Sequence, residues 1–400
     1  MKCVILAAGV GKRMYPLTRT RPKVMVPIAN YPMLEHLLLS AKSAGIKNFV
    51  LVVGYKKELV KSYFEDGSKW GVKISYVFQK DQLGTANAID VTKDKVGKRF
   101  LVLNGDVLIK SDCIKELLEK KEEAVLTLNR REGKGFGVVK VDGGSVKKIT
   151  EKPKDAKISL VNAGIYIFGR KVFDAIEKTK LSKRGEYEIT DSIQYMIDKG
   201  TDVGFHKVED WIDVGYPWNL LDANEDLLKY PLKSSGKAID EESKIEPYAT
   251  IHKKVSIGKG TIVRNGAYII GPVTIGKNCD IGPNCFIRPC TSIGDDVRIG
   301  NGVEIKNSII MNHTKVGHLT YIGDSVIGEG CNFGAGTIVA NLRHDDRSIL
   351  VKVKGETIDS GRRKLGVIFG DGVKTGINST LNVGAVLEDG EIVGPGEVVR

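Results

Sequence analysis

The sequence has no long apolar run. Its longest hydrophobic stretches, such as residues 3–8, have the length of a β-strand, whereas a helix that crosses a membrane needs about 20 apolar residues. The stretch at residues 3–8 is also too short for the apolar part of a signal peptide. We therefore expect a cytoplasmic protein without a membrane partner.

Paired cysteines are missing as well. The chain has six cysteines, and no two of them are spaced as C-x-x-C, so neither a zinc site nor a thioredoxin-like centre is indicated. We interpret all six as reduced packing residues, at positions 3, 113, 279, 285, 290 and 331.

No nucleic-acid-binding pattern accompanies the excess of positive charge. Lysine and arginine total 61 against 49 aspartates and glutamates, a net charge of +12, but the basic residues are scattered along the chain. Because they form no RNP, zinc-finger or helix-turn-helix pattern, we expect no nucleic-acid partner. Small phosphorylated substrates explain the charge equally well.

A chain of 400 residues is longer than a single hydrophobic core usually supports, so we expect at least two domains. We place a first domain at residues 1–228, a polar linker at 229–245 and a second domain at 246–400. The first domain alternates strand patterns with helix patterns, which is typical of an α/β fold with a mostly parallel sheet and ligands beyond the carboxyl ends of its strands. The strands are expected at 49–53, 74–78, 100–103 and 202–208, and the helices at 34–44, 58–64 and 113–121.

The first strand leads into a glycine loop. Residues 3–8 predict a buried strand, and Gly9 and Gly11 break it into a loop with exposed amides. Arg13 and Lys23 add two cations close by in the sequence. Because glycine-loop amides bind anions and desolvated cations neutralise phosphate charge, this segment predicts a site for a triphosphate.

A carboxylate follows another predicted strand. Asp106 comes directly after the strand at 100–103, where a carboxylate suits Mg²⁺ with water and phosphate oxygens as its other ligands. Taken alone, Asp106 is explained equally well as a turn residue.

Several motifs in order closely resemble those of the sugar-phosphate nucleotidylyltransferases. They are G-x-G-x-R at 9–13, P-x-T at 16–18, P-K-x-M-x-P at 22–27, Gln79 with L-G-T-A at 83–86, E-K-P at 151–153, N-A-G at 162–164 and W-x-D-x-G at 211–215. The resemblance implies a Rossmann-like domain in which Arg13 and Lys23 are catalytic and Asp106 and Asp213 hold Mg²⁺. It implies that UTP or dTTP is bound by Leu6, Ala8, Gly9, Gly11, Gln79, Gly84 and Thr85, and the sugar phosphate by Gly137, Glu151, Lys152 and Asn162.

The second domain has a hexapeptide period. Ten aliphatic residues recur at every sixth position from Ile251 to Ile305, a spacing that neither an amphipathic helix nor an ordinary strand has. Such a period is typical of a left-handed parallel β-helix. The resemblance to proteins of that fold implies three hexapeptides per coil, so residues 18 apart should stack. The phase slips by one residue before Ile310 and again before Ile327, and residues 341–366 lose the pattern, so we expect a projecting loop there.

Two cations fall on one face of this β-helix. Arg288 and Lys306 lie 18 residues apart, so they should stack about 4.8 Å apart and repel unless an anion such as a phosphate lies between them. Alternatively, Glu304 pairs with one of them.

The run at 316–324, with 332–337 and Asn341, closely resembles the acetyltransferase domain of the bifunctional N-acetylglucosamine-1-phosphate uridylyltransferases and glucosamine-1-phosphate acetyltransferases, and the chain looks like their archaeal type. The resemblance implies that His318 is the general base, that Ala335 and Asn341 lie near acetyl-CoA, and that the β-helix forms a homotrimer with acetyl-CoA between subunits. The amino-sugar phosphate would contact Arg288, Lys306, Tyr321 and Asn332. After Asn341 the bacterial N-Y-D-G continuation is replaced, and we assign Lys364 to close this site.

The sequence thus predicts a bifunctional enzyme that makes UDP-N-acetylglucosamine by acetylation of glucosamine 1-phosphate and uridylyl transfer. Its expected partners are UTP or dTTP, hexose or hexosamine 1-phosphates and acetyl-CoA, with Mg²⁺ as cofactor. One alternative is a glucose-1-phosphate uridylyl- or thymidylyltransferase with a purely structural β-helix. Another is a non-catalytic scaffold similar to the exchange-factor subunits of translation initiation, against which the retained Arg13, Lys23, Asp106 and Asp213 argue.

Overall fold

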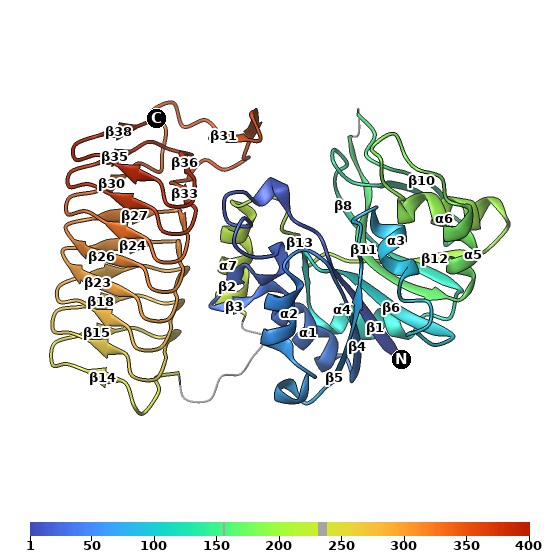
Figure 1. Cartoon of the computed structure of the whole chain (residues 1–400), viewed down its shortest axis with the longest axis horizontal. Coiled ribbons are helices and arrows are strands. Elements are labelled where there is room, and N and C mark those ends of the chain that lie inside the picture. The colour runs from blue at the N-terminus through green and yellow to red at the C-terminus, as the bar shows by residue number, and fades with distance from the viewer. Residues whose placement is uncertain (155–156, 231–237) are drawn as a thin grey trace. The chain divides into compact units, whose positions relative to one another are not determined.

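A computed structural model describes residues 1–154, 157–230 and 238–400 (Figure 1). The chain divides into two compact units, and neither is continuous in sequence. The first comprises Met1–Val10, Pro22–Met25 and Met33–Asp213, and the second comprises Gly11–Arg21, Val26–Pro32 and Val214–Arg400. Residues 231–237 of the expected linker lie outside the described residues. The boundary after residue 228 stays a prediction.

The first unit contains a nine-stranded mixed sheet in the order β5-β4-β1-β6-β11-β8-β12-β10-β9. The strands β5, β4, β1 and β6 run parallel, as the sequence predicts. The prediction of a mostly parallel sheet is wrong for the other half, where β11 pairs antiparallel with β6 and β8 and β10 pairs antiparallel with β9. The strands are β1 (Lys2–Ala7), β4 (Asn48–Val53), β5 (Lys73–Phe78), β6 (Arg99–Asn104), β8 (Ala124–Glu132), β9 (Val138–Asp142), β10 (Ser145–Thr150), β11 (Ile158–Gly169) and β12 (Val203–Lys207), with a separate pair of β7 (Val107–Ile109) and β13 (Trp211–Asp213).

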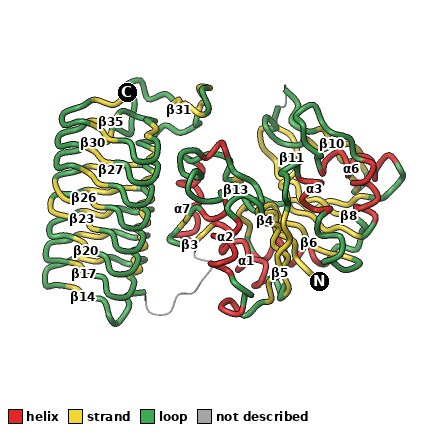
Figure 2. The backbone as a smooth tube through the Cα atoms, viewed as in Figure 1, coloured by secondary structure: helices red, strands yellow, loops and turns green. Residues whose placement is uncertain are grey.

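Helices cover both faces of this sheet (Figure 2). One core contains Ile5 of β1 with residues of α1, α2 and α4, and the other contains Val4 of β1 with residues of α3, α5 and α6. Because successive side chains of a strand point to opposite faces, a continuous apolar run such as residues 3–8 is buried on both sides. The helices are α1 (Met33–Ser43), α2 (Lys57–Phe64), α3 (Thr85–Asp90), α4 (Ser111–Leu118), α5 (Lys171–Lys178) and α6 (Ile189–Asp198), with short turns η2 (Lys23–Met25) and η3 (Ser68–Trp70). Among the described helices, none is long and apolar enough to cross a bilayer.

The second unit is built on a left-handed parallel β-helix, as the hexapeptide period predicts (Figure 1). Its three parallel sheets run β14-β17-β20-β23-β26-β29-β34-β37, β15-β18-β21-β24-β27-β30-β35-β38 and β16-β19-β22-β25-β28-β33-β36. Ile251 lies beside Ile269 and Ile269 beside Ile287, so the predicted stacking of residues 18 apart is confirmed. The inward aliphatic residues form one continuous core.

The strands of the β-helix are two to four residues long and are separated by turns (Figure 2). The turns need glycine where coils approach closely: a Cβ at Gly300 would lie 1.8 Å from the carbonyl oxygen of Gly317 on the next coil. The strands are β14 (Lys244–Ile245), β15 (Thr250–Ile251), β16 (Val255–Ile257), β17 (Ile262–Val263), β18 (Tyr268–Ile269), β19 (Val273–Ile275), β20 (Asp280–Ile281), β21 (Phe286–Ile287), β22 (Thr291–Ile293), β23 (Arg298–Asn301), β24 (Glu304–Lys306), β25 (Ile309–Ile310), β26 (Lys315–His318), β27 (Tyr321–Gly323), β28 (Val326–Ile327), β29 (Asn332–Phe333), β30 (Ile338–Val339), β33 (Ile368–Phe369), β34 (Lys374–Thr375), β35 (Thr380–Leu381), β36 (Val386–Leu387), β37 (Ile392–Val393) and β38 (Val398–Val399).

The two predicted phase slips and the projecting segment are also confirmed. Ile293 lies beside Ile310, and Ile310 beside Ile327, so these coils are one residue shorter than the others. The next neighbour of Ile327 is Phe369, which means that residues 341–366 leave the coil without breaking the stack. That segment was expected to be a loop, but it contains an antiparallel hairpin of β31 (Leu350–Val353) and β32 (Glu356–Asp359).

Segments from the first 32 residues pack on the β-helix within the second unit. They contain the turn η1 (Lys12–Met14) and the pair β2 (Pro27–Ile28) and β3 (Tyr31–Pro32), and they lie with helix α7 (Asn219–Lys229). The buried Asn224 of α7 accepts a hydrogen bond from the Ala29 N–H at 2.9 Å and donates one to the carbonyl of Cys290 at 2.9 Å. Asn30 donates to the carbonyl of Ile293 at 2.6 Å. These contacts tie the segment at 26–32 to the β-helix.

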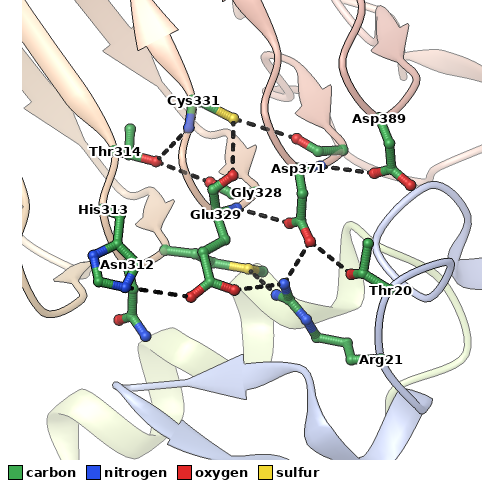
Figure 3. Close-up of polar contacts among 12 residues, drawn as sticks. Thr20, Arg21, Asn312, His313, Thr314, Gly328, Glu329, Cys331, Asp371 and Asp389 are labelled. Carbon is green, nitrogen blue, oxygen red and sulfur yellow. Dashed lines mark hydrogen bonds and ion pairs between the residues drawn. The ribbon is translucent and has the colours of Figure 1, made fainter. Parts of the chain in front are cut away.

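Arg21 ties the segment at 11–21 to two successive coils (Figure 3). Its Nη2 lies 2.8 Å from Glu329 Oε2 and 2.6 Å from Asp371 Oδ2, and only 12% of the side chain is exposed. Thr20 donates to the same Asp371 oxygen at 2.6 Å, and the Glu329 N–H donates to Asp371 Oδ1 at 2.8 Å. The ion pairs are charge-assisted and largely shielded from water, so Arg21 is the main polar anchor of this segment.

Arg21→Gln should loosen the segment at 11–21 without unfolding the β-helix. The substitution keeps a polar side chain but leaves Glu329 and Asp371 without their cation, and hydrogen bonds to charged groups contribute about 1.5–3 kcal/mol. Tryptic cleavage at Arg13 and Arg19 should therefore become roughly 10-fold faster or more, because cleavage follows local opening. Arg363→Gln is the matched control, since its ion pair with Asp346 is exposed on both sides. Equal cleavage rates in wild type and Arg21→Gln would contradict the anchoring role.

Candidate functional site

The carboxyl end of β1 is closely packed in the first unit. The Gly105 N–H donates to the carbonyl of Leu6 at 3.0 Å, and a Cβ at Gly105 would lie 2.4 Å from that oxygen. Glycine at 105 therefore lets the turn before β7 approach the end of β1. Ala8 is buried and its carbonyl accepts from the Tyr55 N–H, whereas a Cβ at Gly9 would meet nothing within 4 Å. The end of β1 thus leads into open space, as a loop that admits a ligand requires.

Asp106, Lys23 and Asp213 lie together at this edge. The buried Lys23 extends from η2, and its Nζ lies 2.7 Å from Asp106 Oδ2. In the pairing of β13 with β7, Asp213 lies opposite Val107, the residue after Asp106. The sequence-predicted catalytic lysine and both predicted metal carboxylates therefore come from neighbouring positions of the first unit.

This donor set fits Mg²⁺. Among the described residues no cluster of three or more histidine, cysteine, aspartate or glutamate side chains forms a closed metal cage. Mg²⁺ usually takes one or two protein carboxylates and completes its octahedron with water and substrate phosphate oxygens. Asp106 and Asp213 supply that number of carboxylates, and Lys23 is a cation beside one of them.

Gln79, Gly84 and Thr85 lie close together in the first unit. The buried Gln79 donates from Nε2 to the carbonyl of Gly84 at 3.3 Å and to Asn87 Oδ1 at 2.8 Å. Gly84 has a φ of +111°, and a Cβ there would lie 2.5 Å from the carbonyl of Tyr187. Thr85 accepts a hydrogen bond from the Ile189 N–H at 3.0 Å. Because both Nε2 hydrogens of Gln79 are used, its side chain can offer a ligand only the carbonyl oxygen.

Gly137, Glu151 and Asn162 also converge. The Asn162 N–H donates to the carbonyl of Gly137 at 2.8 Å, and a Cβ at Gly137 would lie 3.1 Å from Glu151 Oε2. Thr190 donates to that same Glu151 oxygen at 3.0 Å, and burial raises the pKa of the Glu151 carboxyl. The exposed Lys152 follows with its Nζ 3.6 Å from Glu151 Oε1. The four predicted sugar-phosphate residues thus lie together.

The remaining residues of the glycine loop belong to the second unit. Gly11 has a φ of +72° and caps η1, and Thr18 donates to its carbonyl at 2.9 Å. The exposed Arg13 lies over the ring of Tyr216, 5.2 Å from its centroid, and Tyr216 stacks on Trp218. A guanidinium on an aromatic face keeps its hydrogen-bond donors available for an anion.

A cavity of about 310 Å³ in the second unit is lined by Arg288 and Lys306, the two cations that are predicted to bind a phosphate. Arg288 and Lys306 follow Ile287 and Ile305, which are neighbours on adjacent coils. Arg288 pairs with Glu304 at 2.8 Å, and Lys306 lies 3.3 Å from Asp324 Oδ2. The alternative in which Glu304 pairs with one cation is therefore what the structure shows, and the repulsion of two cations no longer requires an anion between them. The cavity is lined by Glu225, Arg288, Pro289, Cys290, Lys306 and Asn307.

Tyr321 and Asn341 lie side by side in the same unit. Asn341 Nδ2 donates to Tyr321 Oη at 3.2 Å and to Asp324 Oδ2 at 2.6 Å. A Cβ at Gly323 would lie 2.6 Å from both Asn341 Nδ2 and Tyr321 Oη, so glycine at 323 leaves the room in which the two side chains meet.

The other four predicted acetyltransferase residues lie outside the cavity lined by Arg288 and Lys306. His318 is the last residue of β26, is exposed, and among the described residues has no hydrogen-bond partner for its imidazole. Asn332 begins β29 and is exposed, Ala335 is half-buried, and the exposed Lys364 bridges back to Leu342 beside Asn341. The cavity lining includes none of these four residues. Their roles stay predictions.

Sequence reasoning missed three residues of these sites. Glu225 of α7 lines the cavity that contains Arg288 and Lys306. The ring of Tyr216 lies under the guanidinium of Arg13, and Asp324 contacts Lys306 and Asn341. Only Asp324 had a sequence signal, because the phase slip before Ile310 shortens this coil to 17 residues, which places Gly323 beside Lys306 and Asp324 directly after it. All six cysteines are free thiols, as expected, and burial raises the pKa of Cys285 to about 12.

Comparison with known proteins extends over both units. A family model described as nucleotidyl transferase matches residues 2–230, and one described as GMPPB C-terminal domain matches residues 269–394. The bifunctional protein GlmU of Methanocaldococcus jannaschii is 43% identical over 378 residues, which cover 94% of this chain and 89% of the relative. The bifunctional sugar-1-phosphate nucleotidylyltransferase/acetyltransferase of Sulfurisphaera tokodaii is 40% identical over 404 residues, which cover 100% of this chain and 97% of the relative. Among solved structures, a putative glucose-1-phosphate thymidylyltransferase from Bacillus anthracis in complex with sucrose is 33% identical, with a TM-score of 0.51, and covers 56% of this chain and 94% of its own.

Proposed function

The chain belongs to the family of bifunctional GlmU proteins, and we propose on that premise that it makes UDP-N-acetylglucosamine. The β-helix transfers an acetyl group from acetyl-CoA to the amine of glucosamine 1-phosphate, and the first domain then joins the product to a uridylyl group from UTP. The observation that carries this proposal is the identity of about 40%, which extends over both units to relatives named as bifunctional.

The nucleotidyl step needs no protein nucleophile. An oxygen of the sugar 1-phosphate attacks the α-phosphorus of UTP, the bond from that phosphorus to the bridging oxygen breaks, and pyrophosphate leaves; positioning and charge neutralisation carry such transfers. Lys23 neutralises the α-phosphate, Arg13 the leaving pyrophosphate, and Lys152 the attacking phosphate. Asp106 and Asp213 would hold Mg²⁺, which lowers the charge on the triphosphate oxygens.

The hydrogen bonds of Gln79 support a pyrimidine base as the group that it contacts. The Nε2 hydrogens of Gln79 are used by Gly84 and Asn87, which leaves the side-chain carbonyl as an acceptor. Uracil and thymine both present an N3–H donor, so this acceptor supports UTP or dTTP as the nucleotide. It does not distinguish between the two, because the N3–H is the same in both bases.

Acetyl transfer requires a base. The amine of glucosamine 1-phosphate attacks the thioester carbonyl, a C–N bond forms, the C–S bond breaks, and coenzyme A leaves. His318 takes the proton that the amine loses and returns it to the thiolate. Arg288 and Lys306 hold the phosphate, Tyr321 and Asn332 the sugar, and Ala335, Asn341 and Lys364 lie at the thioester end of the site.

A homotrimer would explain several exposed apolar side chains of the β-helix. Leu319, Ile338, Ile377 and Ile392 are 62%, 45%, 57% and 74% exposed. Ile338 and Ile392 lie on two different sheets of the β-helix, and Leu319 and Ile377 lie in turns between those two sheets. Exposed apolar side chains that lie along one edge in this way favour an interaction surface. We therefore propose trimerisation through the β-helix, with acetyl-CoA bound between subunits. Sedimentation equilibrium would give three times the mass of 43.7 kDa.

Arg288→Ala and Lys306→Ala should mainly raise the KM for glucosamine 1-phosphate in the acetyl-transfer assay. The phosphate that they hold is bound equally in the ground state and the transition state, so its loss weakens binding and leaves kcat nearly unchanged. Removing one charge-assisted contact should raise KM roughly 10- to 100-fold. Arg264→Ala is the control, because it removes an arginine of a neighbouring coil that pairs with Asp280 and does not line the cavity. A change in kcat alone would contradict the phosphate assignment.

One experiment tests the whole proposal. Purified protein is incubated with acetyl-CoA, one hexosamine 1-phosphate at a time and either UTP or dTTP, and the products are identified by mass. UDP-N-acetylglucosamine made from glucosamine 1-phosphate and UTP supports the proposal. The likeness of the first unit to a putative glucose-1-phosphate thymidylyltransferase favours a second candidate, a glucose-1-phosphate uridylyl- or thymidylyltransferase with a structural β-helix. Nucleotide transfer to glucose 1-phosphate without any acetylated product would establish that alternative.

A further inference from the structure

Asp324 is the most deeply buried carboxylate of the acetyltransferase region. It lies directly after β27 with a φ of +52°, and only 4% of its side chain is exposed. Burial of a carboxylate costs free energy unless the charge is paired and hydrogen-bonded. The hydrogen-bond partners of the Asp324 carboxylate therefore indicate which side chains it positions.

Among the residues that the structure describes, three side chains hydrogen-bond to Asp324, and each of them is a donor. Lys306 Nζ and Asn341 Nδ2 share Oδ2 at 3.3 and 2.6 Å, and Asn307 Nδ2 donates to Oδ1 at 2.7 Å. Lys306 and Asn307 both line the cavity of the predicted phosphate site. Asn341 in turn donates to Tyr321 Oη. One buried carboxylate thus connects the cation assigned to the phosphate with the residues assigned to the sugar and to acetyl-CoA.

The backbone of Asp324 reinforces these connections. Its N–H donates to the carbonyl of Lys306 at 2.9 Å, and its carbonyl accepts from the Gly366 N–H at 2.8 Å, where the projecting segment rejoins the coil. The Leu365 N–H donates to the carbonyl of Asn341 at 3.0 Å. Asp324 is therefore fixed between both ends of the projecting segment and the coil that carries Lys306.

A carboxylate at this position also dictates which way the amide of Asn341 faces. A carboxylate only accepts hydrogen bonds, so Asn341 must direct its NH₂ group toward Asp324. The second Nδ2 hydrogen is used by Tyr321 Oη. A ligand can therefore meet only the carbonyl oxygen of Asn341, which accepts a hydrogen bond from an amine or amide N–H.

We propose that Asp324 is a positioning residue for acetyl transfer: it holds Lys306 against the phosphate and turns Asn341 so that its carbonyl oxygen faces the N–H groups of the reacting amine or of acetyl-CoA. This inference rests on the proposed acetyltransferase function. It adds a residue that touches no substrate atom and acts through Lys306 and Asn341.

The test begins with Asp324→Asn. Asparagine has the same size and also adopts positive φ, so the turn is kept, but it offers one acceptor oxygen to three donors and removes the negative charge. We expect kcat for acetyl transfer to fall roughly 10- to 100-fold, because small displacements of catalytic groups have effects of that size. The KM for glucosamine 1-phosphate should also rise, since Lys306 is no longer held. Uridylyl transfer to N-acetylglucosamine 1-phosphate and the unfolding temperature should stay close to wild type.

A double variant separates positioning from a purely structural hydrogen bond. In Asp324→Asn with Asn341→Asp the two residues are exchanged, so a donor and an acceptor again face each other. If the bond between positions 324 and 341 were all that mattered, acetyl transfer would return. Positioning predicts no rescue, because Lys306 and Asn307 still face an amide in place of a carboxylate.

Asp296→Asn is the matched control. Asp296 also has a positive φ in a turn of the β-helix, but its carboxylate lies 3.6 Å from His313 and lines no part of the cavity. This control should keep full acetyl transfer. The inference is overturned if Asp324→Asn has wild-type kcat and KM, if it loses both activities together with its thermal stability, or if the exchange restores acetyl transfer. A wild-type protein without acetyl transfer would instead contradict the proposed function.

Discussion

His318→Ala should lower kcat for acetyl transfer by roughly 100- to 10,000-fold, the usual contribution of a positioned general base. The amine of glucosamine 1-phosphate is protonated at neutral pH and cannot attack a thioester until it loses a proton. His318 is the last residue of β26, and its imidazole is exposed with no hydrogen-bond partner among the described residues, so it is available to a ligand. The rate is measured as release of coenzyme A.

The control for this variant is His252→Ala. His252 is also exposed on the β-helix, but its ring nitrogen lies 2.9 Å from Tyr268 Oη, and no family motif includes it. Synthesis of UDP-N-acetylglucosamine from ready-made N-acetylglucosamine 1-phosphate should be intact in both variants. Wild-type acetyl transfer in His318→Ala would falsify the proposed mechanism and favour a structural β-helix.

Asp106→Asn should lower nucleotidyl transfer at least about 100-fold, with acetyl transfer unchanged. The variant removes one of the two carboxylates assigned to Mg²⁺ and also the anion that faces Lys23 at 2.7 Å. Losing one group that stabilises transition-state charge typically costs 100- to 1,000-fold in rate. Pyrophosphate release is measured over a series of Mg²⁺ concentrations, and higher Mg²⁺ should recover part of the lost rate.

Asp112→Asn tests whether any lost carboxylate of this region has the same effect. Asp112 lies in α4 of the same unit, and its exposed carboxylate pairs with Lys115. This variant should keep the wild-type rate and the wild-type Mg²⁺ dependence. An equal loss of nucleotidyl and acetyl transfer in Asp106→Asn would indicate misfolding and would leave the metal assignment without support.

The β-helix could be predicted almost residue by residue, because its period has only one structural solution. An inward aliphatic residue at every sixth position fixes which residues stack, so even the one-residue slips before Ile310 and Ile327 could be placed. The loss of that pattern at 341–366 predicted the projecting segment. It did not predict the hairpin, because the strands at 350–353 and 356–359 pair with each other outside the coil and do not follow its period.

The antiparallel half of the first sheet has a signal in the sequence, between β9 and β10. Gly143 and Gly144 join β9 to β10 with φ values of +57° and +84°, and Asp142 lies opposite Ser145. Two consecutive glycines between strand patterns are typical of a tight hairpin turn, which forces antiparallel pairing. The alternation of strands and helices elsewhere in this domain obscured it.

Local patterns say little about contacts between distant segments. Short motifs identified Gly11 and Arg13, and the spacing of 18 residues identified Arg288 and Lys306. They gave no indication that α7 lies against the β-helix or that Glu225 lines the cavity, since the helical pattern of α7 shows only that one face is buried. Short motifs therefore pointed to side chains that lie near one another, but gave little indication of the residues that hold them in place.

The anchoring of Arg21 also sets an order of events during synthesis. Its partners Glu329 and Asp371 follow it by 308 and 350 residues in the chain. At about 5–20 residues per second, a ribosome needs roughly 20 to 70 seconds to add the residues between Arg21 and Asp371. The segment that carries Gly11 and Arg13 leaves the ribosome first and reaches its native surroundings among the last, so a chain whose synthesis stops before residue 329 has made the whole nucleotidyltransferase sequence without the surface on which that segment rests.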